Sequence, residues 1–141
     1  MGLTATYLLD TNIISELARR QPDAGVELRI QTHERICAIA APTVEELAYG
    51  VARLPASRKR DMLEYWLEEV VSRFILLPYD SRCAIWLGRE RARLTALGRP
   101  TPRADGEIAA TAVANGLILA TRNVADFRDF ADLKLENWFE T

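Results

Sequence analysis

Four acidic residues are placed along this sequence where strands and the helices after them would bring reactive groups together. Asp10 directly follows the first apolar run, and Glu46 lies in the first turn of the helical stretch after the second. Asp105 opens a later helical stretch, and Asp126 comes shortly after the fourth apolar run. Carboxylates and waters suit Mg²⁺, and a bound divalent ion lowers the pKa of water and stabilises charge on a phosphoryl oxygen. The four acids therefore favour hydrolysis by a metal-bound water, which needs no other nucleophile.

The direction of the elements predicts that these acids meet at one edge of a sheet. In an open parallel sheet, ligands bind beyond the carboxyl ends of the strands. Asp10 and Asp126 follow strands, and Glu46 begins the helix after one. The helix that carries Asp105 feeds the next strand through a short turn, so its amino terminus returns to the same edge. Four carboxylates gathered there would raise one another's pKa unless a cation neutralised them.

Each acid also has a structural alternative, which the sequence alone leaves open. Asp10 is placed to cap the helix after it, and Asp126 to cap a short turn. Thr43 and Glu46 have the spacing of a capping box, in which the glutamate bonds back to the threonine amide. Asp105 lies where the helix dipole favours negative charge. The expected convergence of all four favours the site over these separate roles.

Short apolar runs alternate with longer stretches of helical periodicity. The runs lack polar alternation, which is typical of strands buried on both faces of a parallel sheet. The element order is βα(α)βααβααβ(α)β, which predicts the α/β class, as a three-layer α/β/α sandwich with a central parallel sheet of about five strands. We expect residues 1–141 to form a single domain. The runs cover residues 6–9, 36–40, 74–78 and 117–120, with a weaker fifth at 133–139.

Turn-forming residues mark the ends of several predicted helices. Pro55 and Ser57 separate two helices, and Gly98 closes a third. Thr101 followed by Pro102 predicts a cap and the first helical position, and an Asn-Gly pair closes that helix.

Composition excludes several other classes of protein. The chain has 141 residues with a net charge of −2, and its overall charge does not indicate nucleic-acid binding. No apolar run approaches the ~20 residues that span a bilayer, and no basic segment precedes the first run, so we expect a cytoplasmic protein without a membrane partner. Cys37 and Cys83 lie apart among apolar residues, which indicates core thiols rather than a disulfide or zinc site. The lone histidine, His33, is expected at the surface.

Four segments in a fixed order resemble the PIN-domain family, specifically the VapC-like toxins of toxin–antitoxin pairs. The resemblance implies a central parallel sheet, Mg²⁺ or Mn²⁺ in the site, and endonucleolytic cleavage of RNA. It also implies homodimerisation and inhibition by a cognate antitoxin. The segments are LLDTNIISEL (8–17), TVEELAYGV (43–51), ADGEIAATAVANGLILATRNVADF (104–127) and LENWF (135–139).

The resemblance also assigns roles to individual residues. The acidic positions of the family fall on Asp10, Glu46, Asp105 and Asp126, and its accessory polar positions on Thr11, Asn12, Thr121 and Asn123. The implied chemistry is phosphodiester hydrolysis. The first three acids would hold the ion, and the fourth would position a second ion or the attacking water. The accessory residues would orient the carboxylates. A further acid, Glu107, would contact a second ion or be solvated.

RNA approaching an acidic crevice needs a basic rim. Arginines precede Asp105 on a helix and in the loop after it, and Arg89, Arg93 and Arg103 are our candidates for contacts with RNA. Arg89 and Arg93 lie four residues apart and share a helix face. The alternative is a solvated helix face laced with glutamates.

Two other functions compete with the nuclease. A phosphatase-type α/β domain also begins with a strand that ends in Asp, but its pattern needs a second aspartate where this chain has Asn12. The other is a catalytically inactive PIN-like binding module, against which the presence of all four acids argues.

Five apolar residues predict a surface for partners. Helices between residues 43 and 71 carry more apolar surface than two helices beside a sheet need, and large exposed apolar patches mark interaction sites. We expect part of this surface to form a homodimer and part to receive an antitoxin helix. The alternative is that these side chains belong to the core. They are Tyr49, Met62, Tyr65, Trp66 and Leu67.

Overall fold

A five-stranded parallel sheet forms the centre of the structure, a computed structural model that describes residues 4–139. Every neighbouring pair is parallel, and the strand order is β3-β2-β1-β4-β5. The predicted order of helices and strands is confirmed, including the weak fifth strand. The strands are β1 (Tyr7–Leu9), β2 (Cys37–Ala40), β3 (Ile75–Leu77), β4 (Ile118–Ala120) and β5 (Lys134–Glu136).

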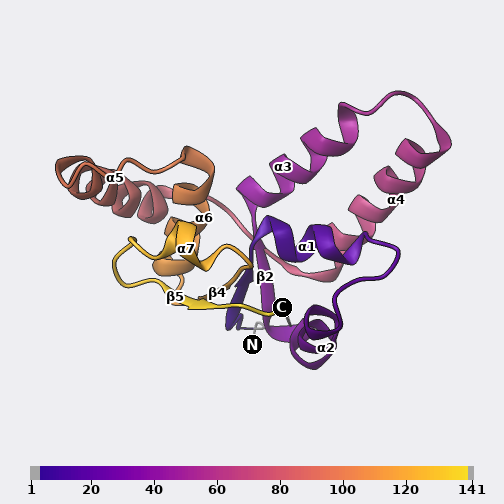
Figure 1. Cartoon of the computed structure of the whole chain (residues 1–141), viewed down its shortest axis with the longest axis horizontal. Coiled ribbons are helices and arrows are strands. Elements are labelled where there is room, and N and C mark those ends of the chain that lie inside the picture. Colours follow the sequence, from indigo (N-terminus) through magenta and orange to yellow (C-terminus); the bar gives the residue numbers. More distant parts are fainter. Residues whose placement is uncertain (1–3, 140–141) are drawn as a thin grey trace.

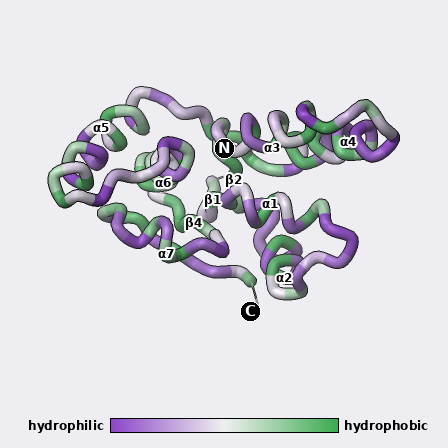
Figure 2. The backbone as a smooth tube through the Cα atoms, turned by 45° about the horizontal axis from the view of Figure 1, so that its top comes forward, coloured by the Kyte–Doolittle hydropathy of each residue, from purple (hydrophilic) through white to green (hydrophobic). Residues whose placement is uncertain are grey.

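Helices cover both faces of this sheet. Figure 2 shows β1, β2 and β4 between α6 and α7 on one side and α1 and α2 on the other. The α3–α4 hairpin extends away from the sheet, on the side opposite α5 (Figure 1). The helices are α1 (Thr11–Leu17), α2 (Ala24–His33), α3 (Ala41–Ala52), α4 (Arg58–Arg73), α5 (Ser81–Ala96), α6 (Arg103–Ala114) and α7 (Val124–Phe127), with a 3₁₀ turn at Glu34–Ile36.

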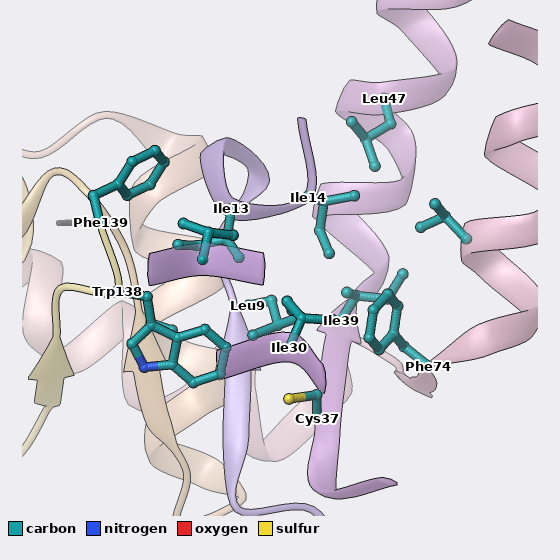
Figure 3. Close-up of a cluster of buried hydrophobic side chains, with 13 residues drawn as sticks. Leu9, Ile13, Ile14, Ile30, Cys37, Ile39, Leu47, Phe74, Trp138 and Phe139 are labelled. Carbon is teal, nitrogen blue, oxygen red and sulfur yellow. The ribbon is translucent and has the colours of Figure 1, made fainter. Parts of the chain in front are cut away.

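Successive strand residues enter two different cores because side chains alternate across a sheet. Leu9 and Ile39 pack with α1 to α4 in the first core, which Figure 3 shows together with Trp138. Leu8 and Ala38 pack with α5, α6 and α7 in the second. Apolar residues on both faces of each strand therefore build the predicted three layers.

Two predicted helix starts are wrong. Helix α3 begins at Ala41, directly after β2, and no side chain caps it. Pro42 lies in its first turn, where a missing N–H costs nothing, and Thr43 is buried inside the helix. Helix α6 begins at Arg103 rather than at Pro102, and Thr101 does not cap it. Both helices thus begin at or next to a proline, whose φ is compatible with a helix start, and neither has a side-chain cap.

Other predicted boundaries are confirmed. The side chain of Ser57 caps α4 by accepting from the backbone N–H of Arg60. Gly98 and Gly116 end α5 and α6 with φ angles of 72° and 66°. Glycine adopts these left-handed values without a steric penalty, which lets the chain turn back toward the sheet.

The two cysteines lie as predicted, whereas the histidine is less exposed than predicted. Cys37 and Cys83 are free and buried. His33 is half-buried, and its ring lies 5.0 Å from that of Tyr7 and 6.0 Å from that of Trp138. Among the described residues, no helix has the length and apolar character to cross a membrane.

The five apolar residues of the α3–α4 hairpin divide between surface and core. Tyr49, Met62 and Tyr65 are 68%, 66% and 66% exposed. Trp66 and Leu67 pack against the first core, so the core interpretation holds for these two. The hairpin therefore carries three large apolar side chains that this chain does not cover.

Candidate active site

Asp10 anchors the site at the carboxyl end of β1. Asp10 is 5% exposed, and its side chain is hydrogen-bonded to its own turn and to the residue that follows β4. Oδ1 accepts from the backbone N–H of Thr11 at 2.8 Å, so Asp10 does cap α1. Oδ2 accepts from the Thr121 hydroxyl at 2.8 Å and from the Asn12 amide at 3.2 Å. The cap fixes the carboxylate in place, so the two interpretations of Asp10 are compatible.

The predicted accessory residues form one hydrogen-bond network around Asp10. The Thr121 hydroxyl, which donates to Asp10, accepts from the backbone N–H of Asn123 at 3.0 Å. The side-chain Oδ1 of Asn12 accepts from the backbone N–H of Arg122 at 3.2 Å. The network therefore ties the end of β1 to the end of β4, across 111 residues of sequence.

Thr11 extends this network to α3. Its hydroxyl donates to the hydroxyl of the buried Thr43 at 3.3 Å. Thr43 thus bonds to another helix, and the capping-box interpretation of Thr43 and Glu46 is wrong. The carboxylate of Glu46 is free of that role and lines the pocket beside Asp10.

Three of the four predicted acids line one pocket of about 340 Å³. It lies where α1 and α3 begin, near the middle of the molecule (Figure 1). Asp126 is exposed on α7 and does not line the pocket, but its charge acts on Asp105. The lining residues are Asp10, Thr11, Asn12, Ser15, Glu46, Asp105, Ile108 and Asn123.

Burial and mutual repulsion set the electrostatics of the pocket. Burial raises the pKa of Asp105 to about 6, with the charges of Asp10, Asp126 and Glu46 adding to the rise in that order. Burial also raises the pKa of Asp10, against the hydrogen bonds from Thr121 and Thr11 that lower it. No ion pair within residues 4–139 includes any of these four acids. Their negative charge is therefore left without a cation.

The donor set of the pocket suits a hard divalent cation. As placed, no three Asp, Glu, His or Cys side chains among residues 4–139 gather closely enough to enclose a metal ion. The available donors are carboxylate oxygens, the ligands that Mg²⁺ and Mn²⁺ take together with water. The raised pKa values of Asp10 and Asp105 measure a penalty on the ionised form that a cation would relieve.

Most of the predicted basic rim is occupied by contacts within the chain. Arg93 donates to both carboxylate oxygens of Glu90 at 2.7 Å and to the backbone carbonyl of Asp129 at 2.8 Å. Arg103 pairs with Glu107 at 3.3 Å, which also accounts for Glu107. Arg89 is exposed on α5. Arg93 and Arg103 therefore fit the alternative interpretation, in which arginines pair with glutamates on a helix face.

Sequence reasoning missed two residues at the site. Ser15 lines the pocket one turn after Thr11, and helical spacing from that residue is the signal that identifies it. The backbone N–H of Arg122 bonds to the side chain of Asn12, and the place of Arg122 between Thr121 and Asn123 is the signal that identifies it.

Comparisons with known proteins agree with this geometry. The family model of the PIN domain matches residues 7–133. VapC ribonuclease Y4jK of Sinorhizobium fredii is 36% identical over 137 residues, which cover 94% of this chain and 97% of the relative. Toxin FitB of Neisseria gonorrhoeae is 36% identical over 125 residues, 85% of this chain and 89% of the relative. The crystal structure of DNA-bound VapBC from Salmonella typhimurium matches with a TM-score of 0.86 and 28% identity, over 96% of this chain and 99% of that one. With its parallel sheet and its acids at one edge, this chain belongs to the PIN domain family.

Proposed function

We propose that this chain is a Mg²⁺- or Mn²⁺-dependent endoribonuclease and the toxin of a toxin–antitoxin pair. The observation that carries the proposal is the group of acids at the carboxyl ends of β1, β2 and β4, whose charge no basic side chain of the described residues neutralises. Relatives that are named as a ribonuclease and as a toxin support RNA as the substrate, rather than the substrate of a phosphatase.

Each acid has a distinct part in the proposed reaction. Asp10, Glu46 and Asp105 would hold the ion, which when bound supplies a water of lowered pKa and stabilises charge on the phosphate. Thr121 and Asn12 keep Asp10 oriented through its Oδ2 atom. Asp126 is exposed at the rim, where it can orient a water or accept its proton.

Metal exchange tests the proposal directly. A purified sample, stripped with EDTA, should cleave RNA when Mg²⁺ or Mn²⁺ is restored and only poorly with Ca²⁺, which prefers looser and higher coordination. Asp10→Asn protein, prepared in parallel, controls for contaminating nucleases. Full cleavage by the wild type in excess EDTA would contradict metal dependence, and absence of cleavage with either ion would favour the inactive binding module.

A substitution that removes the charge of Glu46 but keeps its size tests its role separately. Glu46→Gln keeps the length and polarity of the side chain but makes it a poorer metal ligand. We expect the variant to need a higher Mg²⁺ concentration for half-maximal cleavage. Wild-type Mg²⁺ dependence in this variant would remove Glu46 from the site.

We propose two protein partners for the exposed side of the α3–α4 hairpin. Tyr49, Met62 and Tyr65 leave apolar surface uncovered there, and a surface that pairs with itself gives a two-fold dimer. The solved VapBC assembly supports an antitoxin as the other partner, acting in the cytoplasm where RNA is available. Sedimentation across micromolar concentrations tests the dimer, and a strictly monomeric protein would contradict it. An antitoxin arginine that reaches the acids should weaken inhibition when it is changed to alanine.

A further inference from the structure

Arg122 is held at the edge of the acid pocket by two contacts that fix its backbone and its side chain. Its backbone N–H donates to the side-chain Oδ1 of Asn12 at 3.2 Å. Its guanidinium carbon lies 4.6 Å from the centre of the Phe139 ring. Phe139 is only 9% exposed and packs in the first core, where Figure 3 shows it at the end of the cluster. The ring that supports the guanidinium is therefore anchored in the core.

Among the described residues, the guanidinium of Arg122 stacks on a buried ring without an acidic partner, whereas Arg73, which also stacks on a buried ring, pairs with Glu34. Within residues 4–139, Arg122 forms no ion pair. Its backbone partner Asn12 and its chain neighbour Asn123 both line the acid pocket. Its side chain is exposed to solvent. The arginines that do pair with acids are Arg19, Arg73, Arg82, Arg93, Arg99 and Arg103.

Stacking prepares a guanidinium for an anion that comes from outside. A ring that supports one face of the guanidinium leaves its N–H groups free at the edge of the plane. Those groups form a fork that matches two oxygens of a phosphate. Because the stacked side chain is already ordered, less conformational entropy is lost when an anion binds. A solvated arginine on a helix face, such as Arg89, lacks this advantage.

We propose that Arg122, supported by Phe139, binds a backbone phosphate of the RNA strand that enters the acid pocket. The proposal rests on the proposed endoribonuclease function and names one way in which its substrate is held. A polyanion that approaches uncompensated carboxylates meets repulsion, and a cation fixed at the rim offsets part of it. The site requires only a phosphodiester, so this contact carries no preference for base sequence.

The salt dependence of RNA binding tests the contact. One phosphate contact on single-stranded nucleic acid contributes about 0.7 to the slope of log Kd against log salt concentration. Fluorescent single-stranded RNA is titrated with full-length protein in the Asp10→Asn background, which prevents cleavage. Adding Arg122→Gln to that background should lower the slope by about 0.7 and weaken binding about three- to tenfold. Arg29→Gln, the same charge change on an exposed residue of α2, is the matched control and should leave the slope unchanged.

Two further variants separate charge from stacking. Arg122→Lys keeps the charge but loses the planar fork, so the slope should stay near that of the parent while Kd rises. Phe139→Leu keeps apolar bulk in the core and removes the ring, and binding should weaken less than in Arg122→Gln. If Phe139→Leu fails to fold by circular dichroism, Arg122→Gln alone decides.

Cleavage kinetics distinguish failure of this proposal from failure of the nuclease. With Asp10 restored and Mg²⁺ present, Arg122→Gln should raise KM for RNA and change kcat little. An unchanged KM and an unchanged salt slope, in a preparation whose wild type cleaves, would overturn the Arg122 contact. A wild type that never cleaves, combined with a slope that falls in Arg122→Gln, would overturn the nuclease and support the phosphate contact.

Discussion

Asp10 and Glu90 are buried to nearly the same extent, 5% and 6% exposed, yet their pKa values move in opposite directions. Hydrogen bonds from the Arg93 guanidinium lower the pKa of Glu90, helped by the backbone N–H of Ala131 at 2.6 Å. Asp10 receives only neutral donors, and burial raises its pKa. A cation therefore lowers the pKa of Glu90, whereas burial and the neighbouring charge of Glu46 raise that of Asp10.

The charge of Glu90 is neutralised by an ion pair that stabilises the fold, whereas the charges of the pocket acids have no such pair among the described residues. Glu90 and Arg93 on α5 bind the backbone at Asp129 and Ala131, which connects α7 to β5. Their charges are satisfied within the chain. The pocket acids have no such partner, and strongly perturbed carboxylates in a cleft are typical of functional sites. Two carboxylates with equal exposure can therefore have different roles, one in stability and one in a functional site.

The largest effect should come from removing a pocket acid. Asp10→Asn and Asp105→Asn should each reduce cleavage of RNA about 100-fold or more, the scale of losing one preorganised electrostatic group. Both variants should fold, because asparagine keeps the shape of the side chain. Single-turnover cleavage beside circular dichroism measures the two properties. Near wild-type cleavage by Asp105→Asn would place the metal site elsewhere.

Removing the charge of Glu90, which is paired with Arg93, should lower stability and leave cleavage unchanged. Glu90→Gln loses the ion pair with Arg93 and should lower the free energy of unfolding by on the order of 1.5 kcal/mol, the low end for a charged hydrogen bond because Arg93 is half-exposed. Cleavage per folded molecule should stay close to wild type. Urea unfolding, with Arg93→Gln and the double variant completing a cycle, measures the pair. A cleavage defect as large as that of Asp105→Asn would contradict a purely structural role for Glu90.

The smallest effect concerns pH in the absence of metal. The folded protein holds a proton on Asp105 with a pKa of about 6, above the ordinary value of 3.8. The ionised form therefore destabilises the fold, fully above pH 6, and this penalty disappears as the pH falls toward 3.8. In EDTA, Asp105→Asn should be more stable than wild type at pH 7.5, and the difference should shrink by pH 5. Thermal unfolding at the two pH values checks this, and a constant difference would mean that Asp105 is not perturbed.

The sequence was sufficient for the sheet and for most of the pocket. Apolar runs identify strands covered on both faces, and a parallel sheet brings their carboxyl ends together. Asp10, Glu46 and Asp105 could therefore be placed before any coordinates. The start of α3 could not, because Thr43 fits a capping box as well as it fits a core. Only the packing of α3 against Thr11 decides between the two.

The arginines show a second limit of sequence reasoning. The spacing of Glu90 and Arg93 is visible, but the contacts of these residues with Asp129 and Ala131 span about 40 positions. The sequence around each arginine does not indicate that Arg93 is paired within the chain while Arg122, among the described residues, is not. Whether an arginine is free depends on which acid the tertiary fold brings to it.

The strand order has a consequence for how this protein is made. The central strand β1 pairs with β2 and with β4, so Tyr7 lies beside both Cys37 and Ile118. Both partners are distant from Tyr7 in sequence. Folds dominated by such distant pairings have high contact order and fold slowly. On the ribosome, the carboxylate of Asp10 lacks its Thr121 hydroxyl donor until β4 has been synthesised. The hydrogen-bond network around Asp10 is therefore incomplete for most of translation, and it forms only as the second half of the sheet docks.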